Sequence, residues 1–161
     1  MPQTGNEASV LTPQALLEHW QGHRRVTRRV IEAFPEDKLF SFSVGSMRPF
    51  SKMVQEFLMM AEPLARGVAT GEWVAIEERD LPNTKAGLLA LWDKTTTALN
   101  SILGAMPIDR YSRVDKAFGK WEGRGIDQIL YAIDNEIHHR GQGYVYLRAL
   151  GIEPPAFYDR S

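Results

Sequence analysis

The stretch from Ile126 to Leu150 reads IDQILYAIDNEIHHRGQGYVYLRAL and predicts one long helix. Apolar side chains recur along it at the helical spacing of three to four residues, and the following Gly151 and Pro154-Pro155 predict its end. A helix of about 20 residues spans about 30 Å, which is a common height for a helix bundle. The remaining chain is therefore expected to supply partner helices of similar length.

Three further segments show the same periodicity, so the fold class expected is all-α, a four-helix bundle. Thr12 is an N-cap candidate, and Gly71 is a helix stop signal. Pro63 lies inside the second of these segments and predicts a kink or a break there, because an interior proline removes a hydrogen bond. The three predicted helices cover residues 12–34, 51–70 and 84–104.

The segments between the predicted helices are expected to be irregular. Residues 35–49 are mixed in character and predict an ordered loop whose Leu39, Phe40 and Phe42 help to cover the core. Residues 108–125 lose the helical pattern and predict a long loop with room for a short hairpin. Residues 1–10 are small and polar, typical of a flexible tail on a single domain that spans residues 1–161.

Composition narrows the function classes. The 161 residues are 43% hydrophobic and 24% charged, which is typical of one globular domain. No cysteine is present, so disulfides, thiolate nucleophiles and thiolate zinc sites are excluded. The sequence contains no apolar span of about 20 residues that would predict a membrane segment. We expect a cytoplasmic protein.

The net charge of −1 gives no overall field that would attract nucleic acid, and no nucleic-acid partner is expected. The basic cluster from Arg24 to Arg29 falls within the first predicted helix. We interpret it as a solvated helix face rather than a phosphate-binding surface.

The segment Asn135–Gln142 carries most of the candidate chemistry. Residues four apart share a helix face, so Asn135 lies beside His139 and Asp134 lies beside His138. Either pair could chelate a metal together with a third group from another helix. Nearby, Gly141 and Gly143 each cost about 1 kcal/mol relative to alanine inside a helix, which indicates that a neighbouring backbone or a ligand comes close.

We expect structural roles for three other polar residues. His138 and Arg140 are expected to pair with nearby carboxylates such as Glu136 or Asp134. His23 lies on the apolar stripe of the first predicted helix, which favours a buried histidine with its hydrogen bonds satisfied; near a pocket it would be a candidate acid or base.

Two motifs resemble the DinB/YfiT superfamily. His138-His139-Arg140-Gly141-Gln142, followed by Leu147-Arg148-Ala149-Leu150-Gly151, is similar to the C-terminal signature of that superfamily, and Met47-Arg48-Pro49-Phe50 is similar to its entry into the second helix. The resemblance implies an up-down-down-up bundle, often a homodimer. It also implies a divalent metal, nickel or zinc, held by three histidines, and activities such as thiol transfer, hydrolysis or ring opening on a small-molecule substrate.

The ligand set implied by the resemblance is altered here. Glu56 stands in place of the histidine of the second helix, and Asn135 stands in place of the first of two histidines on the last helix; only His139 matches. Glu56 lies one turn from Met53 and Met60 on an apolar face, where a carboxylate needs a partner or an ion. An oxygen-rich set suits magnesium or manganese better than zinc or nickel.

Two hypotheses follow. In the first, Glu56, Asn135 and His139 hold a divalent cation in a metal-dependent enzyme. In the second, the metal has been lost, and the protein is a dimeric small-molecule-binding or stress-response protein without turnover.

Overall fold

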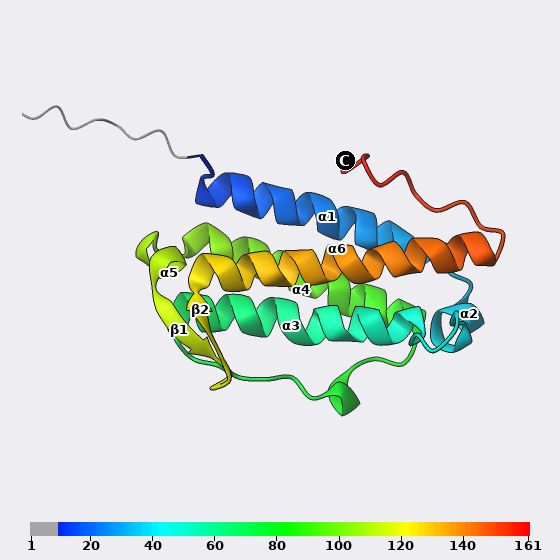
Figure 1. The fold of residues 1–161 in the computed structure, drawn as a ribbon, viewed down its shortest axis with the longest axis horizontal. Coiled ribbons are helices and arrows are strands. Elements are labelled where there is room, and N and C mark those ends of the chain that lie inside the picture. Colours follow the sequence, from blue (N-terminus) through cyan, green and yellow to red (C-terminus); the bar gives the residue numbers. More distant parts are fainter. Residues whose placement is uncertain (1–9) are drawn as a thin grey trace, which may run out of the picture.

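The computed structural model describes residues 10–161, in which four long helices form a bundle. They are α1 (Pro13–Ala33), α3 (Phe50–Thr70), α4 (Lys85–Ala105) and α6 (Gly125–Ala149). Helices α1 and α6 run in one direction, and α3 and α4 run in the other (Figure 1). Each of α1 and α3 packs against both α4 and α6. The predicted all-α, up-down-down-up bundle is therefore confirmed, with a small sheet added at one end.

Local capping marks the starts of α1 and α4 and the end of α3. The side chain of Thr12 accepts a hydrogen bond from the Ala15 amide, and the side chain of Thr84 accepts one from the Gly87 amide. Gly71 ends α3 in the left-handed conformation, with φ +82°. Of the kink or break predicted at Pro63, the break does not occur: α3 continues through this residue, because buried apolar residues on both sides hold the helix against the core.

The connections contain more regular structure than the sequence predicts. The expected loop after α1 includes the short helix α2 (Glu36–Ser41), which corrects that prediction, although its Leu39 is buried as expected. Before α6 come the short helix α5 (Asp109–Ser112) and the predicted hairpin. The hairpin pairs β1 (Val114–Ala117) antiparallel with β2 (Trp121–Arg124).

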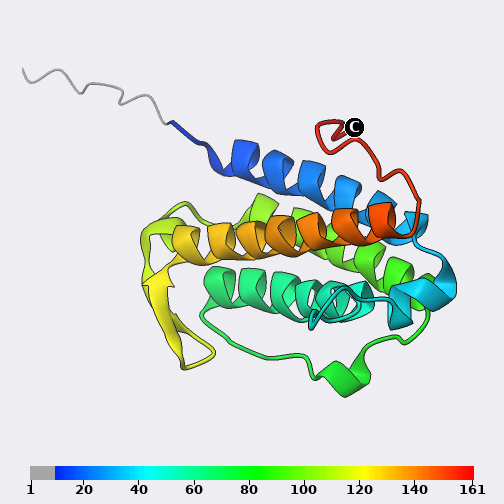
Figure 2. The ribbon, with the colours of Figure 1, turned by 45° about the vertical axis from the view of Figure 1, so that its right-hand side comes forward.

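A long connection joins the parallel helices α3 and α4. Residues 71–84, which include the short 3-10 helix η1 (Glu78–Asp80), run along the outside of the bundle from one end to the other (Figure 2). Of the predicted flexible tail, residues 1–9 lie outside the described residues, and Val10 is exposed.

The apolar core is divided into two clusters. One lies toward the hairpin end and includes Leu16, Trp20 and Ile133; the other lies toward α2 and includes Val30 and Phe50. Between them, α1, α4 and α6 contribute buried polar side chains, which we call the central polar layer: His23, Arg24, Thr27, Thr95, Glu136 and Arg140.

Glu136 is the hydrogen-bond acceptor at the centre of this layer. Its carboxylate accepts from Trp20 Nε1 at 3.1 Å and from Thr27 Oγ1 at 2.6 Å. Arg24 NH1 lies 3.9 Å from the same carboxylate, and both side chains are almost fully buried. A buried charge needs such partners, because desolvation is otherwise very costly.

The position of Arg24 corrects the interpretation of the basic cluster as a solvated face. Its guanidinium donates to Thr96 Oγ1 and to the Trp92 carbonyl, and it lies 3.9 Å from the centroid of the Trp92 ring. Arg25 is exposed, and Arg28 pairs with Asp93. Arg25 and Arg28 therefore reach solvent, whereas Arg24 is part of the core.

The prediction that His23 is buried is confirmed, and one of its ring nitrogens has a hydrogen-bond donor. Its Nδ1 accepts a hydrogen bond from Arg140 NH2 at 3.0 Å, and Arg140 NH1 donates to the His23 carbonyl at 3.0 Å. Arg140 thus makes its hydrogen bonds to α1 rather than to the carboxylates of its own helix, while His138 is exposed. Burial, reinforced by the nearby charge of Arg140, lowers the pKa of His23 to about 3.

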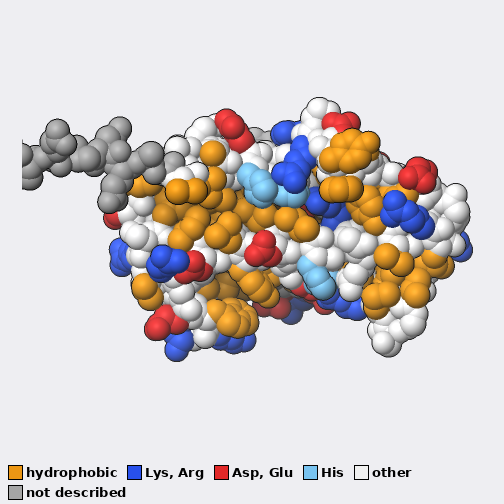
Figure 3. All heavy atoms as spheres, turned by 45° about the horizontal axis from the view of Figure 1, so that its top comes forward, with side chains coloured by type: hydrophobic (Ala, Val, Ile, Leu, Met, Phe, Trp, Pro, Cys, Tyr) orange, Lys and Arg blue, Asp and Glu red, His pale blue; other side chains and the backbone are white. Residues whose placement is uncertain are grey.

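The surface formed by α1 and α6 also has polar side chains between apolar regions. Histidine and arginine side chains gather near the middle of the bundle, between apolar patches (Figure 3). The C-terminal segment folds back over this region, where Arg25 Nε donates to the Arg160 carbonyl at 2.7 Å. Across the described part of the chain, no helix is both long and apolar enough to cross a membrane.

Candidate functional site

The antiparallel packing of α3 and α6 brings the three predicted site residues together. Asn135 Nδ2 donates to Glu56 Oε1 at 2.9 Å, and His139 Nε2 lies 3.4 Å from the same oxygen. All three side chains are partly buried. Glu56 and His139 are therefore close enough to contact one ion. Whether they do so stays a prediction.

The hydrogen bonds of Gln142 fix the tautomer of His139. Gln142 Nε2 donates to Met47 Sδ at 3.6 Å, which leaves Gln142 Oε1 as the acceptor facing His139 Nδ1 at 2.7 Å. With the Gln142 amide in this orientation, the proton is assigned to Nδ1. In a neutral ring, Nε2 consequently presents its lone pair to Glu56. Orientation of a ring by its second nitrogen is common among metal-binding histidines.

The group formed by Glu56, Asn135, His139 and Gln142, which we call the cluster, has a further member, Arg48. The sequence does not assign Arg48 to the site. Its NH1 lies 2.7 Å from Glu56 Oε2, the carboxylate oxygen that Asn135 and His139 do not contact. Burial alone would raise the pKa of Glu56, but the hydrogen bonds from Asn135 and Arg48 and the charge of Arg48 outweigh it, so the pKa is lowered. Glu56 is therefore ionised at neutral pH.

The donor atoms fit a divalent cation in part. Two ligands that each lie about 2.1 Å from a tetrahedral ion are about 3.4 Å apart, which matches His139 Nε2 and Glu56 Oε1. Asn135 Oδ1 is buried and accepts no hydrogen bond from the described residues; rotation of the amide would exchange it with Nδ2. The charge of Arg48 opposes a cation. Within residues 10–161, no group of three His, Asp or Glu side chains could hold a metal ion, so a third protein ligand would have to be a group of another type, such as this amide.

The two motifs singled out in the sequence meet in space at this cluster. Besides the contact of Gln142 with Met47, Tyr146 Oη donates to the Arg48 carbonyl at 2.8 Å. The family model described as the DinB family matches residues 1–161.

The chain belongs to the DinB family.

Relatives of this DinB protein agree on the fold. The uncharacterized protein YjoA of Bacillus subtilis (strain 168) is 28% identical over 151 residues, which cover 90% of this chain and 95% of YjoA. The crystal structure of YjoA, described as a DinB-like protein, has a TM-score of 0.73 at 24% identity and covers 91% of this chain and 99% of its own. A DinB-like protein from Bacillus cereus has a TM-score of 0.74 at 16% identity, with 90% and 97% of the two chains covered.

Proposed function

We propose that the cluster binds one divalent cation between His139 and Glu56, and that the protein is a metal-dependent enzyme acting on a small molecule. The observation that carries the proposal is the 3.4 Å separation of His139 Nε2 and Glu56 Oε1. Both atoms are acceptors when the ring is neutral, so their lone pairs repel unless a proton or a metal ion lies between them. The buried Asn135 Oδ1, which lacks a donor, is a suitable third ligand.

Each residue has a separate task under this proposal. Gln142 holds the His139 ring in the tautomer that leaves Nε2 available, and Arg48 holds one oxygen of Glu56 so that the other points toward His139. A bound cation would supply Lewis-acid activation of a thiol or a water. Nickel or zinc follows from the resemblance, whereas the two oxygen donors suit magnesium or manganese.

Calorimetric titration of tag-free protein with Mn²⁺, Mg²⁺, Ni²⁺ and Zn²⁺ tests the proposal. We expect one site, with affinity at least tenfold weaker in His139→Ala because the only nitrogen ligand is lost. Asn135→His should tighten Ni²⁺ and Zn²⁺ at least tenfold by replacing an amide oxygen with an imidazole.

The matched control is His138→Ala, which removes an exposed histidine one position away and should leave binding unchanged. Equal effects of His138→Ala and His139→Ala, or no binding of any of the four ions, would contradict the metal-dependent function.

A second candidate is a small-molecule-binding or stress-response protein without a metal, dimeric if it follows the resemblance. The observation that favours it is the ion pair of Arg48 with Glu56, since a guanidinium can supply the positive charge that a metal would otherwise provide.

Arg48→Gln separates the two candidates. If the site takes a cation, Gln can keep a hydrogen bond that orients Glu56 while the opposing positive charge is lost, so Mn²⁺ binding should tighten several-fold. If the ion pair replaces the metal, the variant should bind no ion and lose about 1 kcal/mol of unfolding free energy, the upper range for a partly exposed pair. Urea denaturation beside the calorimetric titration distinguishes these results.

A further inference from the structure

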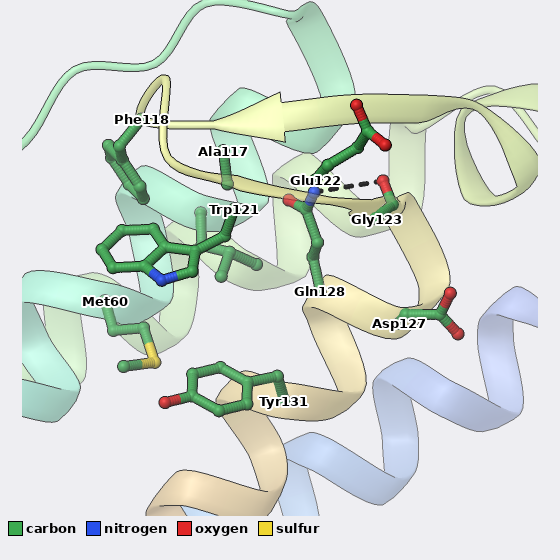
Figure 4. Close-up of a pocket in the computed structure, with 10 residues that line it drawn as sticks. Met60, Ala117, Phe118, Trp121, Glu122, Gly123, Asp127, Gln128 and Tyr131 are labelled. Carbon is green, nitrogen blue, oxygen red and sulfur yellow. Dashed lines mark hydrogen bonds between the residues drawn. The ribbon is translucent and has the colours of Figure 1, made fainter.

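A pocket of about 500 Å³ lies where the hairpin meets the helices α3 and α6. This volume is in the usual range for a small-molecule site. The walls are apolar and largely aromatic, formed by Met60, Leu64, Phe118, Trp121 and Tyr131. Figure 4 shows the rings of Trp121 and Tyr131 on either side of Met60. Both rings are more than 60% exposed, so a ligand that covered them would remove a large apolar surface from water.

The pocket lining contains two charged side chains, and neither faces the aromatic rings (Figure 4). Asp127 is paired with Arg124 at 2.8 Å. Glu122 is adjacent to Trp121 on β2, so its side chain lies on the other face of the strand, where Lys116 is its partner in the hairpin register. The interior of the pocket therefore suits an uncharged molecule, because an ion would lose its hydration without gaining a partner.

The polar groups of the pocket leave one hydrogen-bond donor without an acceptor. The Gln128 amide is not available, because its Nε2 donates to the carbonyls of Asp115 and Gly123, at 3.1 and 3.2 Å, and its Oε1 is fully covered. The indole N–H of Trp121 makes no hydrogen bond within the described part of the chain, and it is directed toward Met60 (Figure 4). A ligand would gain from an acceptor atom placed against this N–H.

The hairpin turn holds the aromatic wall in place at a conformational cost. Phe118 and Gly119 at its tip have φ +52° and +70°, and a hairpin turn with two such residues ordinarily has asparagine, aspartate or glycine first. The Phe118 ring packs edge-on against Trp73 and Trp121, with centroids 5.3 and 6.4 Å away. The strained residue thus contributes an aromatic surface that a preferred turn residue would not supply.

The pocket adjoins the cluster. Met60 follows Glu56 by one turn of α3, and Tyr131 precedes Asn135 by one turn of α6. Because α3 and α6 are antiparallel, both steps lead toward the hairpin (Figure 1). A molecule seated in the pocket would therefore have one end about one helical turn, roughly 5 Å, from the cluster.

We propose that this pocket binds a flat, uncharged aromatic molecule that carries a hydrogen-bond acceptor, with its ring against Met60 and Tyr131 and its acceptor facing the Trp121 indole N–H. Burial of the apolar rings supplies the affinity, and the hydrogen bond orients the ligand. Binding depends on the pocket residues alone. The assignment of such a molecule as the substrate class of the neighbouring cluster rests on the proposed function.

The fluorescent ketone 6-propionyl-2-dimethylaminonaphthalene tests the proposal, because it is flat and uncharged and its emission shifts to the blue when it leaves water. Its analogues with a carboxylate or an aminomethyl group in place of the ketone carry opposite charges. We expect the ketone to bind at least tenfold tighter than either analogue. In ¹⁵N-labelled full-length protein, titration with the ketone should move the Trp121 indole N–H signal downfield.

Two substitutions of Trp121 separate its ring from its N–H group. Trp121→Ala should weaken ketone binding about tenfold, because the apolar wall is lost. Trp121→Phe keeps a ring and should weaken it only about threefold, the effect of one neutral hydrogen bond. Phe157→Ala is the control, since it removes an aromatic ring of the same 63% exposure as Trp121 outside the pocket lining.

Three results would overturn the proposal: affinity for either charged analogue equal to that for the ketone, wild-type affinity in Trp121→Ala, or wild-type affinity in Trp121→Phe.

His139→Ala distinguishes failure of the pocket from failure of the metal site. Retained binding of the ketone in this variant without added metal supports the pocket, whatever the metal titrations show. Loss of ketone binding in His139→Ala, with the fold intact by circular dichroism, would instead place the ligand at the cluster and overturn the pocket assignment.

Discussion

His23 lies in the central polar layer as a neutral imidazole, and its hydrogen bond from Arg140 depends on that neutrality. Protonation would place a third positive charge beside Arg24 and Arg140, with Glu136 as the one buried carboxylate of the layer. The low pKa of about 3 therefore couples the stability of the fold to pH.

The sign of this effect follows from proton binding. Above the ordinary histidine pKa of 6.5, neither the folded nor the unfolded state holds the proton, and His23 has no effect. As the pH falls below 6.5, the unfolded chain binds a proton that the folded protein does not, so the free energy of unfolding decreases. We expect this decrease in urea denaturation between pH 6.5 and about 5, where carboxylates remain ionised.

His23→Gln should flatten the plot of unfolding free energy against pH between pH 6.5 and about 5, whereas His19→Gln, which removes an exposed histidine, should change it less. A wild-type slope in His23→Gln would show that other groups cause the pH dependence.

At the level of single residues, the sequence indicates which of these residues lie together better than it indicates what surrounds them. The proximity of Asn135 to His139 follows from helical spacing, whereas Glu56 is implied by the family resemblance and is consistent with its place on an apolar face. Arg48 lies before α3, and no periodicity connects it to Glu56. Arg24 and Glu136 are charged residues in amphipathic helices, a pattern that ordinarily predicts side chains exposed to solvent. Their burial depends on hydrogen-bond partners from other helices.

Within α6, two nearby glycines have different surroundings. A Cβ at Gly143 would lie 2.6 Å from the Phe50 ring, so the close neighbour there is a side chain of α3 rather than the expected backbone or ligand. A Cβ at Gly141 would meet nothing within 4 Å, so no neighbouring backbone comes close at that position.

The two glycines form a matched pair for substitution. Gly141→Ala should raise the free energy of unfolding by about 0.5–1 kcal/mol, because alanine favours an exposed helix. Gly143→Ala should lower it by about 1–3 kcal/mol, because the Phe50 ring must shift. Urea denaturation of the two variants measures the contrast. Effects of the same sign would contradict the close packing of α6 on α3.

Secondary structure is predictable where its signals are local. Thr12 and Gly71 mark their helix ends through contacts within a few residues, and both ends match the structure. Helix α2 is missed because six residues with one buried side chain are too short to show a periodicity. The local signal at Pro63 leaves a kink or a break open, and tertiary packing, rather than local preference, decides that α3 continues.

The whole bundle has two apolar clusters separated by polar side chains, so the two ends should respond to mutation independently. Val30→Ala in the cluster near α2 and Val68→Ala in the cluster near the hairpin should each cost about 2 kcal/mol. The double variant should equal their sum within about 0.5 kcal/mol, because no contacts are shared.

The comparison pair is Val30→Ala with Val54→Ala, which belong to one cluster and should deviate more from additivity. Coupling between Val30 and Val68 above about 1 kcal/mol, measured by urea denaturation, would mean that the polar layer does not separate the two ends.

The connection over residues 71–84 has a consequence for engineering. Since α3 and α4 are parallel, the chain must travel the full height of the bundle, about 30 Å, which needs at least about nine extended residues. Lengthening it adds only a small loop-closure entropy, whereas cutting it below that reach would pull a helix out of place. The exposed stretch at 74–80 is thus a permissive position for grafting a reporter domain, and the same segment sets a lower limit on how far the protein can be miniaturised.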